Sequence, residues 1–143
     1  MNDYITMKTR HQQEVNDFPM FFAFNNKQFD EGMKSFGLDP NETNKIYKLG
    51  NTGGYYLRTD AEKLNEMLYR HAKEIQDAID SDTTGDGFIF EMFYYELANH
   101  EYIVTYDVTD TLNALGFTEE EVYADKKLLH GLKKAIKAQK VRY

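Results

Sequence analysis

The chain of 143 residues contains no cysteine. This absence excludes disulfide frameworks, thiolate nucleophiles and cysteine-based zinc sites, and it fits a reducing compartment. The first 18 residues are polar and show no apolar signal-peptide core. No apolar run approaches the roughly 20 residues that a membrane helix needs, and the longest, FPMFFAF at 18–24, has the length of a strand. We therefore expect a cytoplasmic protein with no membrane segment.

Charge is distributed unevenly along the chain, whose formal net charge is −7. Residues 1–59 carry seven acidic and seven basic side chains. Residues 60–110 carry 13 acidic and 3 basic side chains, a net charge of −10, whereas residues 111–143 carry a net charge of +3. An acidic field repels phosphate backbones, which argues against direct nucleic-acid binding by most of the chain.

Most strand signals lie in the first 60 residues, and EYIVTYD at 101–107 predicts a short strand or an extended link. The aromatic run at 19–24 predicts a buried strand, and KIYKLGNTGGYYLR at 45–58 predicts a β-hairpin because its glycines permit a tight turn. Between them, residues 25–36 repeat apolar side chains at helical spacing. These patterns predict a small sheet with a helix between its first two strands.

Helical patterns dominate the rest of the chain. An amphipathic stripe runs through residues 60–80, and the mostly apolar segment at 88–99 predicts a central buried helix. Thr118 and Glu121 have the T-x-x-E spacing of a capping box, which predicts the start of a C-terminal helix over 118–140.

Early strands followed by helices predict an α+β fold. We expect a small antiparallel sheet of about three strands, packed against four to five helices. The length and the 41% apolar content suit a single domain over 1–143. Within it, residues 1–17 are predicted to form a loosely ordered N-terminal arm or a short first helix.

The polar run FYYELANHEY at 93–102 ends the predicted central helix. Glu96 and His100 are four residues apart, so they would share a helix face, and an acid–base pair is chemically feasible. An enzyme or metal protein using these two residues, with His71, is therefore one alternative. The favoured interpretation is structural, with polar groups that satisfy the helix end. The candidate cluster comprises Tyr95, Glu96, Asn99, His100 and Glu101.

The loop DTTGDG resembles part of a calcium-binding loop. Asp82, Thr84 and Asp86 fall on the first, third and fifth positions when Gly87 takes the sixth. The twelfth position, a bidentate glutamate in such loops, is Phe93. We interpret the segment as a turn between helices and predict no metal or cofactor.

The acidic middle of the chain is the predicted partner-binding surface. If its carboxylates share one face, they would imitate phosphate spacing and occupy a basic groove of another protein. The candidate partner-binding residues are Glu62, Glu66, Glu74, Asp77, Asp80, Asp82 and Asp86.

The basic C-terminal segment offers a second alternative, a nucleic-acid-binding accessory protein. Its acidic start and its modest net charge of +3 weaken that interpretation. The residues that would act in this way are Lys133, Lys134, Lys137 and Lys140.

Two stretches, FPMFFAFNNKQFDEGMKSFGL at 18–38 and FYYELANHEYIVTYDVTDTLNALGFT at 93–118, resemble an uncharacterised family of small proteins. Its members are encoded by phages, plasmids and integrated elements of Firmicutes, and ELANHEY is the most specific piece. The family has no established activity to transfer to any residue. The resemblance implies an accessory protein of a mobile element, a setting in which small acidic proteins often inhibit host defence systems.

We therefore expect a non-enzymatic protein that acts by binding another protein. The specific hypothesis is an anti-defence inhibitor, anti-CRISPR or anti-restriction, that blocks the basic nucleic-acid-binding groove of a host nuclease.

Overall fold

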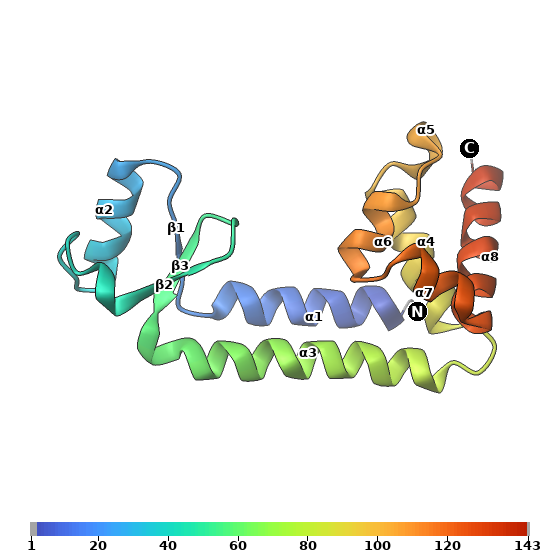
Figure 1. The fold of residues 1–143 in the computed structure, drawn as a ribbon, viewed down its shortest axis with the longest axis horizontal. Helices are drawn as coiled ribbons and strands as arrows, with labels where there is room; N and C mark the ends of the chain where they lie inside the picture. Colours follow the sequence, from blue (N-terminus) through green and yellow to red (C-terminus); the bar gives the residue numbers. More distant parts are fainter. Residues whose placement is uncertain (1–2, 143) are drawn as a thin grey trace. The chain divides into compact units, whose positions relative to one another are not determined.

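The computed structural model describes residues 3–142, which form two compact units (Figure 1). The sheet unit comprises residues 13–72, and the helical unit comprises residues 3–12 together with 73–142. Within the described residues, no helix combines the length and the apolarity needed to span a bilayer.

Two long helices contribute residues to both units. Helix α1 spans Asp3–Asp17, and helix α3 spans Ala61–Ser81. Residues 1–17 were open to two interpretations, and the described part of this segment is helical rather than loosely ordered. Helix α3 follows the amphipathic stripe predicted for 60–80.

The sheet unit contains the antiparallel sheet. Its strands are β1 (Phe21–Phe22), β2 (Ile46–Leu49) and β3 (Gly54–Leu57). Their order is β1-β3-β2, and both pairings are antiparallel, which confirms the predicted α+β class with a three-stranded sheet. Two short 3₁₀ helices flank the hairpin, η1 (Thr43–Lys45) and η2 (Arg58–Asp60).

Helix α2 (Asn26–Ser35) covers one face of the sheet (Figure 1). Asn25 caps it, because the Asn25 side chain accepts a hydrogen bond from the Gln28 N–H at 2.8 Å. The Phe21 ring stacks on Tyr55, with 5.2 Å between centroids, and lies edge-on to Phe36 at the same distance. This aromatic packing holds α2 on the sheet.

The opposite face of the sheet carries one aromatic side chain from each strand. Successive residues of a strand point to opposite faces, so Phe22, Tyr47 and Tyr56 point away from α2. The pairing register agrees, because Tyr47 lies opposite Tyr56, and their ring centroids are 5.9 Å apart. Phe22 lies opposite Gly54, whose missing side chain leaves room for the ring. We call Phe22, Tyr47 and Tyr56 the open face.

The helical unit is built around helix α4 (Phe88–Asn99), as the apolar segment predicted. Its side chains Ile89, Met92, Phe93 and Leu97 are fully buried. Helices α5 (Tyr102–Thr105), α6 (Thr109–Leu115) and α8 (Lys126–Arg142) pack against it, and the start of α1 contacts it through Tyr4. The strand alternative for 101–107 was wrong, because this segment contains helix α5.

The single helix predicted over 118–140 is interrupted. Helix α7 (Glu119–Ala124) begins with the predicted capping box of Thr118 and Glu121, and α8 begins after Asp125. The Asp125 carboxylate accepts hydrogen bonds from the N–H groups of Lys127 and Leu128, at 2.9 and 3.1 Å. This aspartate caps the first turn of α8, which is the physical reason for the break.

Candidate functional site

The polar cluster predicted at the end of α4 centres on a buried carboxylate. Glu96 is only 3% exposed. Tyr4 donates its hydroxyl to Oε2 at 3.0 Å, and Lys8 donates Nζ to both oxygens at 2.9 Å. Asn99 donates to Oε1 at 3.4 Å. Each oxygen of Glu96 thus accepts two hydrogen bonds, and the charge is balanced by one lysine.

Tyr95 completes the surroundings of the Lys8 ammonium, whose nitrogen lies 5.0 Å from the Tyr95 ring centroid. Burial, together with the negative charge of Glu96 and its hydrogen bond, holds the pKa of the Tyr4 hydroxyl well above its usual range. Tyr4 therefore remains a hydrogen-bond donor. Sequence reasoning missed Tyr4 and Lys8, because only tertiary packing brings α1 beside α4.

The other two members of the predicted cluster have backbone roles. His100 ends α4, and its N–H donates to the Glu96 carbonyl at 3.0 Å. Glu101 is exposed and has a positive φ of 55°, the left-handed conformation that reverses the chain after a helix. Among the described residues, no hydrogen bond joins the side chains of Glu96 and His100. The structure thus brings together Tyr95, Glu96 and Asn99.

His71 does not belong to the Glu96 cluster. It belongs to a cluster in which an arginine and a histidine contact one glutamate, and each unit contains one such cluster. In the helical unit, Arg10 and His11 both contact the Glu74 carboxylate, at 2.6 and 2.7 Å. In the sheet unit, Arg70 and His71 both contact Glu14. In the helical unit α1 supplies the arginine and histidine and α3 supplies the glutamate, whereas in the sheet unit α3 supplies the arginine and histidine and α1 supplies the glutamate.

A repeated sequence pattern corresponds to these two Arg–His–Glu clusters, and sequence reasoning missed it. The pattern R-H-x-x-E occurs at 10–14 and again at 70–74. Hydrogen bonding by Arg70 is the main cause that lowers the pKa of Glu14 from 4.5 to about 2. Hydrogen bonds from Arg10 and then His11 lower that of Glu74 from 4.5 to about 2 as well.

The acidic residues predicted to bind a partner are mostly engaged within their own unit. Besides Glu74, Asp77 pairs with Lys73 at 3.5 Å, and Asp80 accepts from the Gln76 amide at 2.9 Å. Glu62 and Glu66 lie in the sheet unit, where both are exposed and one helical turn apart on α3. The seven candidates are therefore divided between the two units.

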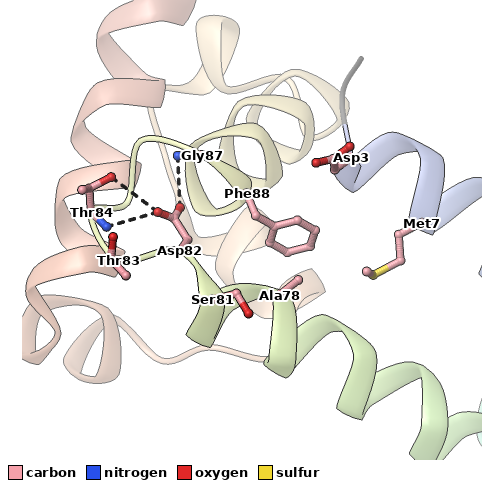
Figure 2. Close-up of a pocket in the computed structure, with 9 residues that line it drawn as sticks. All are labelled: Asp3, Met7, Ala78, Ser81, Asp82, Thr83, Thr84, Gly87 and Phe88. Carbon is pink, nitrogen blue, oxygen red and sulfur yellow. Dashed lines mark hydrogen bonds between the residues drawn. The ribbon is translucent and has the colours of Figure 1, made fainter.

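Asp82 caps helix α4 from the preceding loop (Figure 2). Its carboxylate accepts four backbone N–H groups, at 2.9 to 3.2 Å, from Thr84, Gly85, Gly87 and Ile89. Burial would raise the pKa of Asp82, but these hydrogen bonds outweigh it and hold the pKa below its usual value. The carboxylate is thus occupied by the helix start.

Asp86, the other carboxylate of the calcium-like loop, is also occupied. It contacts His130 at 2.7 Å and Lys134 at 3.1 Å, both on α8. Among residues 3–142, no group of three or more histidine, aspartate or glutamate side chains is placed to hold a metal ion. The loop therefore fastens α4 and α8 together.

A pocket of about 560 Å³ lies beside this loop in the helical unit. Figure 2 shows Phe88 and Met7 on its apolar side and the Asp82 carboxylate turned toward its own loop. The pocket offers hydroxyls and carboxylates, and no imidazole or amine lines it. Its lining residues are Asp3, Met7, Ala78, Ser81, Asp82, Thr83, Thr84, Gly87 and Phe88.

The basic face of α8 is solvated, while its other face packs in the core. Leu132 and Ala135 are buried there, and Lys134 is held by Asp86 and lies over the Phe90 ring. The remaining lysines of the nucleic-acid alternative are exposed; they are Lys133, Lys137 and Lys140.

The open face of the sheet unit was not found by sequence reasoning. Phe22 is 56% exposed and Tyr47 is 42% exposed, although both are large aromatic side chains. Phe24, two residues after the first strand, is 76% exposed. The alternation of side chains between the two faces of each strand is the signal that could have predicted this face.

The model of a family of unknown function, DUF7659, matches residues 3–138. The chain belongs to this family. Membership of DUF7659 confirms the resemblance to an uncharacterised family and assigns no activity or site residue. No curated protein and no solved structure matches the chain.

Replacing Lys8 by methionine should destabilise the protein by about 2 kcal/mol, because the Glu96 carboxylate loses its cation while remaining buried. Lys8 is partly exposed, so the loss falls below that of a fully buried pair. Adding Glu96→Gln should restore part of the loss. The exposed Lys137→Met is the control, and urea unfolding is the measurement. Equal stability of Lys8→Met and Lys137→Met would contradict the structural role of Lys8.

The depressed pKa values of Glu14 and Glu74 make stability depend on pH. Their contribution is fully present above about pH 4.5, and it is lost as the pH falls from 4.5 through about 2. Urea midpoints measured across this range should fall less steeply for Glu14→Gln/Glu74→Gln than for the natural chain. Exposed Glu119→Gln/Glu120→Gln is the control pair. Identical slopes for all three proteins would contradict the assignment.

Proposed function

We propose that this protein acts by binding another protein through the open face of the sheet unit. The observation that carries the proposal is the exposure of Phe22 and Tyr47 on a sheet face that α2 leaves uncovered. Soluble chains rarely keep contiguous apolar patches in water without a use for them. Aromatic side chains also dominate the binding energy of protein interfaces.

The backbone holds these side chains in place before any partner arrives. Phe22, Tyr47 and Tyr56 come from three strands whose register is fixed by ladder pairing. On the other face, the rings of Phe21 and Tyr55 pack under α2 and support the strands from behind. Side chains ordered in this way lose little further entropy on binding, which favours affinity.

The chemistry of the helical unit supports binding rather than catalysis. Both oxygens of Glu96 are filled by donors from Tyr4, Lys8 and Asn99, so no acceptor is left for a substrate proton. The carboxylate oxygens of Asp82 likewise accept hydrogen bonds from backbone N–H groups. These groups hold helices together.

A finer hypothesis keeps the acidic residues as a second candidate surface. In it, the protein is a mobile-element inhibitor of a host defence nuclease, acting in the bacterial cytoplasm. The exposed pair Glu62 and Glu66 and the formal net charge of −7 support a basic partner. Surface electrostatics of this kind would make binding sensitive to salt.

The test compares three tagged proteins in pull-downs from a bacterial lysate, read by mass spectrometry at low and raised salt. Phe22→Thr/Tyr47→Thr alters the open face and keeps strand propensity. Glu62→Gln/Glu66→Gln alters the acidic pair. We expect the first variant, with unchanged thermal stability, to lose a near-stoichiometric partner by tenfold or more, and the second to retain it.

Retention of that partner by Phe22→Thr/Tyr47→Thr would contradict the proposal. Loss only in Glu62→Gln/Glu66→Gln, together with loss at raised salt, would instead favour the acidic surface and the inhibitor hypothesis.

A further inference from the structure

The open face has a positively charged group at its edge that is fixed in two ways. Arg58 follows β3, and its Nε donates to the Ile46 carbonyl at 3.2 Å. Its guanidinium carbon lies 4.5 Å from the centroid of the Tyr47 ring. The hydrogen bond and the cation–π contact together hold the guanidinium beside the exposed Tyr47 ring.

These contacts leave the outer part of the guanidinium available. Among the described residues, no hydrogen bond engages the Nη1 or Nη2 atoms of Arg58, and the side chain is exposed. Two N–H groups of a guanidinium can bind a carboxylate in a bidentate fork. Because the group is already positioned, it gives up little freedom when such an anion binds.

The local charge suits a single anionic group. Residues 18–58, which include the sheet and α2, carry five basic and four acidic side chains, a net charge of +1. The rest of the chain carries −8, which gives the total of −7. The net negative charge of the whole chain disfavours a polyphosphate backbone, which needs several cations in a row. It opposes a single carboxylate much less, since screening limits repulsion to about 8 Å at physiological salt.

We propose that the open face binds a partner segment that carries a carboxylate next to apolar anchor residues. The carboxylate pairs with the Nη atoms of Arg58, and the anchors pack on Tyr47, Tyr56 and Phe22. This inference rests on the proposed function and adds the chemistry of the partner. It assigns to Arg58 a recognition role that composition and periodicity do not reveal.

The strand β2 supplies a matched control for Arg58. Lys48 lies opposite Tyr55 in the register, and Tyr55 packs against Phe21 under α2. Because successive side chains of a strand point to opposite faces, Lys48 lies on the sheet face opposite to that of Tyr47. Lys48→Gln therefore removes the same charge close by without touching the open face.

The test selects peptides from a random 12-residue library on the intact protein and discards those that also bind Phe22→Thr/Tyr47→Thr. Surviving peptides should be enriched in aspartate or glutamate beside aromatic or aliphatic residues. Their affinity, measured by fluorescence anisotropy, should fall tenfold or more with Arg58→Gln. Arg58→Lys, which keeps the charge and loses the fork, should also weaken binding, and Lys48→Gln should leave it within about twofold.

The outcomes separate the two proposals. Surviving peptides without carboxylates, unaffected by Arg58→Gln, would overturn this inference and leave the open face as a binding surface. A library without any open-face-dependent peptide would overturn both. Binding of a single-stranded oligonucleotide that disappears with Arg58→Gln, but not with Lys48→Gln, would show that Arg58 binds phosphate. That result would overturn the proposal that Arg58 binds a carboxylate. Unchanged thermal unfolding of Arg58→Lys shows that a loss of binding is not a loss of fold.

Discussion

The buried carboxylate of Glu96 is the constraint that organises the helical unit. A carboxylate at 3% exposure needs donors and a cation, and α4 itself supplies only the Asn99 amide. Tyr4 and Lys8 supply the rest, so the first half of α1 must pack against α4. Glu91, one turn and a half earlier on α4, accepts the N–H groups of Asp3 and Tyr4 and fastens the start of α1 to the same helix.

The sheet unit has a different distribution of polar and apolar groups. Its α2 side is filled by stacked rings, of which Phe21 contacts Tyr55, Phe29 and Phe36. Gly32 allows this packing, because a Cβ there would lie 2.0 Å from the Phe21 ring. Helix α2 covers one face of the sheet, and Phe22 and Tyr47 on the other face remain exposed. Charged groups of the helical unit are thus used for folding, and exposed rings of the sheet unit are available for contact.

Local patterns in the sequence were sufficient for most of the elements and insufficient for the contacts between them. The hairpin over 45–58, the helix over 25–36 and the central helix follow from spacing and turn residues, which act over a few positions. The break at Asp125 competes with a continuous helical pattern and depends on which carbonyls and N–H groups are left free. The Lys8–Glu96 pair joins residues 88 apart, and no local rule contains such information. The acidic candidates were selected for their negative charge alone, whereas the structure divides them between the two units.

Photo-crosslinking tests the central claim most directly, because it reports contact rather than the effect of a substitution. A photoreactive phenylalanine analogue at Phe22 places the probe on the open face, and the same analogue at Glu62 places it on the acidic pair of α3. With the intact protein bound to its captured partner, the account predicts a covalent product from position 22. A product from position 62, with none from position 22, would contradict it.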